Sequence, residues 1–359
     1  MNSRERISEA VKQAADEAGF DLAGIAPLRE EDFPELKAFE EWIEAGHAGE
    51  MKYLEKRTEA GELRRASARN TAPWARSVIV CALNYNTDRP YSTKAKDPHR
   101  GWISRYAWGK GDYHDVVLQR LRKVETAVLA LAAEQHMHAE TRCYVDTGPI
   151  VERVYAKYAG VGWIGKNTCV IHPKKGSWMF LGVILTSLDL AADLPAPDRC
   201  GSCTRCIDAC PTEAIVAPGK LDSRRCIAYL TIEKRGEIDP ELQGKMGHHV
   251  FGCDICQDVC PWNNKAGNAQ ATPLPEFQPQ EKLFRPELSW LARMTEEEFQ
   301  QTFRGSPVKR AKFAGMRRNV ALAMGNSGNQ EFVPLLESMT EDTDQAIAAS
   351  AHWALAKLR

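Results

Sequence analysis

Eight of the eleven cysteines in the 359-residue chain fall between positions 200 and 260. They form two runs that each end in Cys-Pro, with one cysteine between the runs: Cys200, Cys203, Cys206 and Cys210-Pro211; Cys226; Cys253, Cys256 and Cys260-Pro261. Thiolates bind transition metals, and the cytosol keeps cysteines reduced. The N-terminal residues 1–6 are charged and lack the apolar segment of a secretory signal. This region is therefore predicted to bind metal through its cysteines.

The first run has the spacing C-x2-C-x2-C-x3-C-P, which in bacterial ferredoxins holds 4Fe–4S clusters. Three thiolates bind one cluster and the fourth binds its neighbour, and Cys226 can replace the cysteine that the second run lacks. The predicted ligand sets are Cys200, Cys203, Cys206 and Cys260 for one cluster, and Cys210, Cys226, Cys253 and Cys256 for the other. Zinc is the alternative, but zinc ribbons pair C-x2-C units and do not normally contain this run. Two neighbouring clusters conduct electrons, which predicts a redox protein.

A glycine-rich segment at 160–167 matches G-x-G-x-x-G and nearly matches the phosphate-binding loop of ATPases. Both motifs require a strand before the glycines and a helix after them. Here a helical pattern precedes the glycines, a strand pattern follows at Cys169–Ile171, and Asn167 replaces the residue that would bind magnesium. NAD and ATP are therefore not expected. The glycines are predicted to let a large flat ligand approach the backbone, with Trp163 and Ile164 packed against it.

The hydrophobic pattern predicts an α/β region, a cysteine region and a helical tail, with domains at 1–193, 194–275 and 276–359. Predicted helices cover residues 3–19, 33–46, 113–136 and 150–158, and predicted strands cover 20–25, 77–83 and 142–145. Segments 169–172 and 177–186 are predicted to form a β-hairpin. In the tail, 320–324 and 353–357 repeat at an offset of 33 residues, which is typical of stacked HEAT-like helix pairs.

The charge balance excludes a protein that is basic throughout, because 47 Lys and Arg face 48 Asp and Glu. The longest apolar runs, 78–83 and 178–185, are too short to cross a membrane. One stretch of the tail, 299–330, nevertheless carries six cations and no acid. A solvated helix face is the simpler reading of such a run, but the lack of any acid favours contact with phosphate.

Asp112-Tyr-His114 is similar to the start of a cobalamin motif, D-x-H-x-x-G, but Val117 replaces its glycine. His114 is therefore interpreted as an ordinary residue of the first turn of a helix. The motifs that carry a wider resemblance are Arg105-Tyr-Ala-Trp-Gly109, Asp112-Tyr-His114, Val145-Asp-Thr-Gly-Pro149, Glu152-Arg153, Ala159–Thr168, the two cysteine runs, Tyr229-Leu-Thr-Ile-Glu233 and Phe251–Trp262. In this order, and over nearly the whole chain, they resemble epoxyqueuosine reductase.

This resemblance implies a nitroreductase-like α/β domain that binds cobalamin, a bacterial two-cluster ferredoxin-like domain and a HEAT-like tail. It implies reduction of epoxyqueuosine to queuosine at the wobble position (34) of tRNA, the last step of queuosine biosynthesis. Cobalamin would be bound base-off, without a protein histidine on cobalt, and two 4Fe–4S clusters would reduce it. The implied cobalamin contacts are Arg65, Tyr106, Asp146, Asn167, Val170 and Leu181.

Asp146 is the proton donor that the resemblance implies for the departing epoxide oxygen. From the residues alone, an Asp in Asp-Thr-Gly-Pro is more often a turn former. An Asp with an ordinary pKa of about 3.9 is a poor acid at neutral pH. Asp146 would therefore act as an acid at neutral pH only where burial beside an apolar macrocycle raises its pKa.

The implied tRNA substrate requires a basic surface. The predicted contacts are Arg224, Arg225, Lys234, Arg235, Lys309, Arg310, Lys312, Arg317 and Arg318. Those from 309 to 318 are expected to line one face of the first helix pair of the tail. The expected partners are the anticodon stem-loop of tRNA and an external electron donor, and the expected state is a cytoplasmic monomer without membrane contact.

Two other classes of function compete with this one. A reductive dehalogenase-like corrinoid reductase would use the same cofactors on a small molecule, but it would not explain the basic tail. A non-catalytic electron carrier or RNA-binding module with structural clusters would bind no corrinoid. The absorption spectrum of cobalamin after reconstitution would separate the last class from both enzymes.

Overall fold

The computed structural model describes residues 3–29, 33–265 and 267–359 and divides into two compact units. Unit 1 comprises residues 1–86, 113–203 and 261–271, and unit 2 comprises 87–112, 204–260 and 272–359. These units cut across the three predicted ranges. Trp102 and Trp108, which were expected in the first domain, lie in the core of unit 2 with Leu288 and Phe299. Their large apolar surface explains why residues 87–112 belong to unit 2.

Unit 1 contains the α/β region, and every helix and strand predicted there is present with slightly shifted ends. Its elements are α1 (Ser3–Glu17), β1 (Leu22–Pro27), α2 (Pro34–Glu44), β2 (Ser77–Asn84), α3 (Tyr113–Glu134), β4 (Thr141–Tyr144), α4 (Glu152–Tyr158), β5 (Trp163–Ile164), β6 (Val170–Ile171), β7 (Met179–Thr186) and α9 (Pro261–Asn264).

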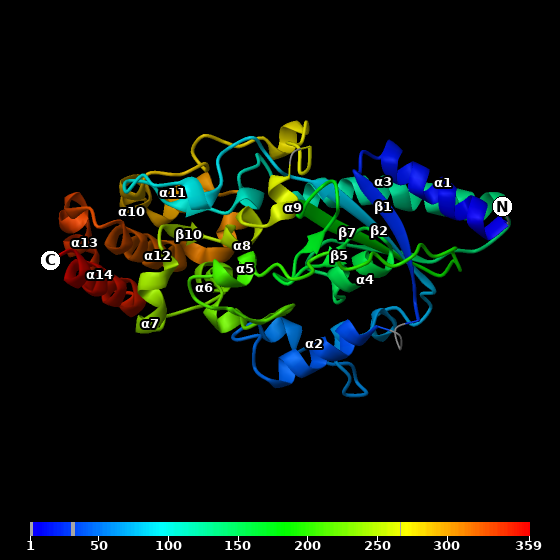
Figure 1. Cartoon of the computed structure of the whole chain (residues 1–359), viewed down its shortest axis with the longest axis horizontal. Helices are drawn as coiled ribbons and strands as arrows, with labels where there is room; N and C mark the ends of the chain where they lie inside the picture. The colour runs from blue at the N-terminus through cyan, green and yellow to red at the C-terminus, as the bar shows by residue number, and fades with distance from the viewer. Residues whose placement is uncertain (1–2, 30–32, 266) are drawn as a thin grey trace. The chain divides into compact units, whose positions relative to one another are not determined.

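Four strands of unit 1 form an antiparallel sheet in the order β1-β2-β7-β4. All residues of β2 are buried, which fits the continuous apolar run that predicted this strand. Gly182 in β7 leaves room for Leu121 of α3 on one face of the sheet. On the other face, the carbonyl of Ala159 after α4 lies too close to Gly24 for any side chain. In Figure 1, α1 and α3 lie on one side of these strands and α4 on the other.

The predicted hairpin of 169–172 with 177–186 is wrong in its strand pairing. β6 pairs with β5 in a small two-stranded sheet, whereas β7 lies between β2 and β4. The turn itself is present, because His172 and Gly176 form an isolated antiparallel bridge. β7 is apolar enough to be buried in the middle of the main sheet, and this long-range pairing replaces the local one.

Unit 2 contains the region of most of the cysteines and the helical tail. Its elements are β3 (Trp102–Ile103), α5 (Arg205–Asp208), β8 (Ile215–Ala217), β9 (Lys220–Leu221), α6 (Ile227–Ile232), α7 (Pro240–Gln243), β10 (His249–Phe251), α8 (Ile255–Asp258), α10 (Leu288–Arg293), α11 (Glu296–Thr302), α12 (Lys312–Ser327), α13 (Val333–Met339) and α14 (Gln345–Leu358). Within the described residues, no helix has both the length and the hydropathy of a membrane span.

The tail after residue 287 is entirely helical. The two repeated segments lie in α12 and α14, which pack against each other. Their contact is close at Gly325, where an added Cβ would lie 2.7 Å from the Cα of Ala354. The repeat therefore marks the two helices whose backbones approach one another in the tail core.

Arg318 of α12 holds the C-terminal end of α6. Its guanidinium group donates hydrogen bonds to three carbonyl oxygens in and just after that helix: Leu230 (2.6 Å), Lys234 (2.9 Å) and Gly236 (2.7 Å). The last carbonyls of a helix lack partners within it, and a cation there is favourable. Since Arg318 is only 2% exposed, the prediction that it lies on an exposed basic face is wrong.

We expect Arg318→Ala to lower the free energy of unfolding by about 3 kcal/mol, because one buried and two partly buried carbonyl groups lose a charged donor. Urea denaturation followed by circular dichroism measures this change. Lys309→Ala is the matched control, since Lys309 is exposed and its loss should change stability by about 0.5 kcal/mol or less. Equal stability of the two variants would show that the Arg318 bonds contribute nothing net.

Candidate functional site

Asp146 lies on a tight turn between β4 and α4. Its φ of 54° is in the left-handed region, which Asp adopts more easily than most residues. The backbone N–H of Thr147 donates to the carbonyl of Val145 at 2.5 Å. Gly148 packs against the Tyr144 side chain, and an added Cβ would lie 2.5 Å from the Tyr144 Cβ. The Asp-Thr-Gly motif thus builds the turn, and the turn leaves the Asp146 side chain 64% exposed.

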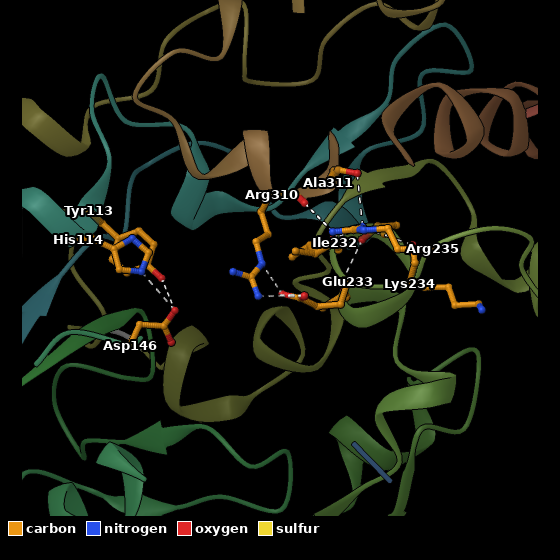
Figure 2. A network of polar contacts seen from close by, with 11 residues as sticks. Tyr113, His114, Asp146, Ile232, Glu233, Lys234, Arg235, Arg310 and Ala311 are labelled. Atoms are coloured by element: carbon orange, nitrogen blue, oxygen red, sulfur yellow. Dashed lines mark hydrogen bonds and ion pairs between the residues drawn. The ribbon is translucent and has the colours of Figure 1, made fainter. Parts of the chain in front are cut away.

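Two side chains from the start of α3 contact the Asp146 carboxylate (Figure 2). The Tyr113 hydroxyl donates to Oδ2 at 2.9 Å, and His114 Nε2 lies 3.4 Å from the same oxygen. The Tyr113 ring is itself stacked on Phe180 of β7, with ring centroids 4.3 Å apart and planes 2° apart. His114 does lie in the first turn of a helix as interpreted, but that interpretation missed its contact with Asp146.

The protein's own side chains lower the pKa of Asp146. Surrounding protein atoms desolvate the carboxyl group, which raises its pKa. Hydrogen bonds from His114 and Tyr113, together with the charges of His114 and Arg153, outweigh this effect and favour the carboxylate. The protein's own side chains therefore keep Asp146 ionised at neutral pH.

Glu152, the first residue of α4, behaves in the opposite way. Its Oε1 is buried and has no hydrogen-bond partner among the described residues. Burial raises the pKa of Glu152 to about 8, and the negative charge of Asp146 adds to this effect. The Glu152 backbone N–H and the charges of Arg65 and Arg153 oppose it without cancelling it. Sequence reasoning gave Glu152 no role, although it stands in the Glu152-Arg153 motif.

The predicted cobalamin contacts are divided between the two units. In unit 1, Arg65 Nη1 donates to the carbonyl of Ile150 at 2.8 Å, and Asn167, 4% exposed, accepts from the Cys169 N–H at 3.3 Å. Val170 and Leu181 belong to the apolar core beneath α4. Tyr106 lies in unit 2, where it packs against Phe251 with ring centroids 6.0 Å apart.

Unit 1 offers the surface that a large, partly apolar cofactor needs. Ile164, Met179 and Leu181 are only half-buried and pack on the core beneath α4. Apolar side chains with an open face can cover a macrocycle. These half-buried apolar side chains therefore fit the flat face of a corrin ring.

The glycines at 160–165 were predicted to let a flat ligand approach the backbone, but the atoms close to them belong to the protein itself. An added Cβ would lie 2.8 Å from the Leu194 carbonyl at Gly160, and 2.5 Å from atoms of Ile171 at Gly162 and Gly165. Trp163 is 1% exposed, with its ring centroid 5.1 Å from that of Trp262. The glycines thus allow close packing inside unit 1. The helix before them and the strand after them confirm that this is not a dinucleotide-binding motif.

None of the eleven cysteines forms a disulfide bond. Burial raises the pKa of Cys253, and nearby Cys226 and Cys210 contribute, so three of the four ligands predicted for one cluster lie close together in unit 2. Backbone and indole N–H groups already point at predicted ligands: Ala214 N–H donates to Cys210 Sγ at 3.3 Å, and Trp163 Nε1 donates to Cys200 Sγ at 3.4 Å. Such donors suit the negatively charged thiolates of an iron–sulfur cluster.

Among the described residues, no group of three His, Cys, Asp or Glu side chains is set closely enough to hold a single metal ion. A 4Fe–4S cluster needs no such group, because its four thiolates bind four different irons.

The second cysteine run is anchored by a buried carboxylate. Asp254 accepts hydrogen bonds from Trp102 Nε1 at 2.9 Å and from the Arg105 N–H at 2.8 Å. The Arg105 guanidinium group in turn donates to the carbonyl of Thr87 at 2.9 Å. The motif at 105–109 therefore helps to position the loop that carries Cys253, all within unit 2.

Most of the predicted tRNA contacts are engaged in contacts with the protein. Arg310 pairs with Glu233 at 2.8 Å, and Arg235 donates to the Arg310 carbonyl at 2.9 Å (Figure 2). Arg224 pairs with Asp222, Arg225 with Glu241 and Arg317 with Asp342.

Arg317 and Arg318 do not lie on an exposed face of the tail. Arg317 is mostly buried and Arg318 is fully so. Two residues predicted to bind tRNA are exposed: Lys309, just before α12, and Lys312, its first residue. The predicted basic face is therefore reduced to these lysines and their exposed neighbour Arg310.

Comparison with known proteins places this site in a family. Residues 65–147 match the family model for epoxyqueuosine reductase (QueG, DUF1730), and residues 199–263 match the 4Fe-4S double cluster binding domain. An epoxyqueuosine reductase of Synechocystis sp. is 45% identical over 299 residues, which cover 82% of this chain and 98% of the relative. One of Xanthomonas campestris is 38% identical over 353 residues, which cover 97% and 95%. The chain belongs to the epoxyqueuosine reductase family.

Solved structures of this family have the same fold. Epoxyqueuosine reductase from Streptococcus thermophilus aligns with a TM-score of 0.84 at 29% identity, over 98% of this chain and 90% of that one. Another structure, of an epoxyqueuosine reductase with an epoxyqueuosine-modified tRNA stem loop, aligns with a TM-score of 0.83 at 29% identity and the same coverage.

Family membership confirms the main functional prediction made from the sequence. The protein is an oxidoreductase of the epoxyqueuosine reductase family, and residues 199–263 form its 4Fe-4S double cluster binding domain. The alternative, a corrinoid reductase acting on a small molecule, is not favoured by these relatives.

We expect Trp163→Phe to make the midpoint potential of the cluster bound by Cys200 more negative. Phenylalanine keeps an aromatic ring beside Trp262 but removes the N–H donor to Cys200 Sγ. Hydrogen bonds to cluster sulfurs favour the reduced, more negative state. A redox titration followed by electron paramagnetic resonance measures the potential.

Trp74→Phe is the matched control for this variant, because Trp74 is a half-buried tryptophan beneath Arg142. Its replacement should leave both cluster potentials unchanged. An unchanged potential in Trp163→Phe would show that the indole N–H does not reach the sulfur once the cluster is bound.

Proposed function

We propose that this protein reduces the epoxyqueuosine at the wobble position of tRNA to queuosine, with Asp146 as the group that hands a proton to the departing oxygen. The observation that carries the proposal is the Asp146 carboxylate, held by Tyr113 and His114 in a chain that also has the eight cysteines of two clusters. Removal of the epoxide oxygen consumes two electrons and two protons and yields an alkene and water.

Unit 1 supplies side chains suited to hold cobalamin. Leu181 and Val170 give apolar contacts, and Arg65 and Asn167 give polar ones at the edge. Cobalamin held there would supply, in its low-valent state, a nucleophile and two electrons. The role of Arg65, Asn167, Val170 and Leu181 is to orient the cofactor and exclude water from its face, and Tyr106 belongs to the same proposed set.

The finer description of the architecture is part of this proposal. The sheet of unit 1, with helices on both faces, supports a nitroreductase-like cobalamin domain at 1–193. The cysteines support a ferredoxin-like domain at 194–275, and the packing of α12 on α14 supports a HEAT-like tail at 276–359. We also propose a cytoplasmic monomer that receives electrons from an external donor, in keeping with eleven cysteines that form no disulfide bond.

The proposed tRNA surface centres on the start of α12. A relative of known structure binds a modified tRNA stem loop, and phosphate groups require exposed cations. Lys309 and Lys312 are exposed, and Arg310 keeps a half-exposed side chain while paired with Glu233. Lys234, which extends away from that pair in Figure 2, completes the proposed patch. The buried Arg318 and the mostly buried Arg317 are left out of it.

We expect Asp146→Asn to lower turnover roughly 10²–10⁴-fold, because the amide keeps the size of the side chain but has no proton to transfer. Cobalamin binding should be retained. An anaerobic assay with epoxyqueuosine-containing tRNA, a strong reductant and mass spectrometry of the nucleoside measures turnover. Asp115→Asn, at an exposed position of α3, should react at the wild-type rate. Undiminished turnover in Asp146→Asn would assign the proton donor to another group.

We expect Lys309→Glu combined with Lys312→Glu to weaken binding of full-length tRNA and to flatten its salt dependence by about 0.7–0.9 for each lost phosphate contact. Phosphate contacts position RNA without reading its bases, so all substrate tRNAs should be affected alike. Filter binding across a series of salt concentrations measures both quantities.

Lys123→Glu combined with Lys282→Glu is the matched control for the tail lysines. It changes the net charge by the same amount at two other exposed positions. Identical salt slopes for the two double variants would mean that Lys309 and Lys312 act only through the overall charge.

A further inference from the structure

The proposed reduction requires more protons than Asp146 can hold. The following inference rests on that proposed function. Two protons are consumed for each epoxide oxygen that leaves as water. The contacts of Asp146 with Tyr113 and His114 keep its pKa low, so at neutral pH this carboxylate carries no proton of its own. A second group at the site must therefore store one.

Glu152 is placed to be that group. It begins α4 directly after the Asp146 turn, and its buried Oε1 has no partner among the described residues. The charged groups that face it are Asp146 from the turn, Arg65 and Arg153. Both arginines are occupied elsewhere, since Arg65 donates to the Ile150 carbonyl at 2.8 Å and Arg153 to the Thr168 carbonyl at 3.1 Å.

A buried carboxyl group without a counter-ion is stable in its neutral form. Charging it would place a negative charge in a poorly solvated position next to the Asp146 carboxylate. The raised pKa of Glu152, about 8, and the lowered pKa of Asp146 agree with this geometry. When the surroundings separate the pKa values of two carboxyl groups in this way, one group stays protonated and the other stays ionised.

We propose that Glu152 stores a proton that Asp146 delivers to the departing oxygen, so that the two carboxyl groups hold one transferable proton between them. The Glu152 O–H bond breaks while an O–H bond forms on Asp146. The Asp146 O–H bond then breaks as an O–H bond forms on the departing oxygen, which leaves both carboxyl groups ionised until solvent returns a proton to Glu152. A second proton that follows the same route from solvent completes the water molecule. The electrons are those of the proposed reduction, and no further reductant is involved. Glu152 acts through Asp146 and positions the proton without touching the substrate.

The test compares Glu152→Gln, Glu152→Asp and the wild type in single-turnover reactions with an epoxyqueuosine stem-loop. Glutamine has no transferable proton, so the rate should fall about 10²-fold, with unchanged affinity for cobalamin and for the stem-loop. The wild-type rate should decline above about pH 8, as Glu152 loses its proton. This decline should disappear in Glu152→Gln and return, with part of the rate, in Glu152→Asp. Glu134→Gln, at an exposed end of α3, should match the wild type throughout.

A second measurement locates the stored proton without activity. The folded protein binds this proton more tightly than the unfolded chain, whose Glu has a pKa near 4.5. The stabilisation from Glu152 is therefore complete below pH 4.5 and is lost as the pH rises through about 8. Denaturation at several pH values should show this loss in the wild type and not in Glu152→Gln.

Three results would overturn the proposal. One is a wild-type rate in Glu152→Gln with the alkaline decline intact. Another is a slow Glu152→Gln that has also lost affinity for cobalamin, which would make Glu152 a cofactor contact. The third is equal pH dependence of stability in both proteins. A wild type that converts no epoxyqueuosine would instead overturn the proposed function itself, whatever the stability measurement gives.

Discussion

Because every residue of β2 is buried and pairs in register with β7, these two strands fix the positions of the other segments of unit 1. β7 carries Phe180, on which Tyr113 stacks, and pairs with β4, whose end leads into the Asp146 turn. The helices α3 and α4 pack on opposite faces of the same strands. The functional carboxylate and the side chains that hold it thus come from separate segments that share one rigid frame. A packing defect in β2 would displace the contact between Tyr113 and Asp146 even with the turn intact.

The parts of this structure that follow from short-range pattern could be predicted from the sequence. The apolar run at 77–83 gives β2, and the cysteine spacing gives a two-cluster region that the family comparison confirms. Strand pairing depends on distant segments, so the true partner of β7 could not be read from the turn beside it. The prediction that Arg318 lies on an exposed face was wrong for the same reason. A cation in a basic run is expected to be solvated, and the carbonyl groups that surround Arg318 come from in and just after α6, more than eighty positions away.

The candidate site shows the same division between local and distant information. The Asp-Thr-Gly turn is a local feature, and the residues that build it are consecutive. The partners of Asp146 come from the start of α3, with Tyr113 33 positions earlier, and they lower its pKa against the effect of desolvation. Glu152 is chemically almost identical to Asp146, yet its surroundings give it the opposite state of ionisation. The residue type shows which side chains could act as acids, whereas their contacts determine which of them carries the proton.

The hydrogen bonds of Arg318 also bear on how the protein can be divided. A fragment that ends before α12 would keep α6 and the cysteines on both sides of it, but it would leave the carbonyl groups of Leu230, Lys234 and Gly236 without their donor. The segment 204–260 is thus not a detachable electron-transfer module, although its cysteine spacing is that of one. Anyone shortening this chain for expression or for grafting onto another enzyme would have to retain α12 or design a replacement cation at the end of α6.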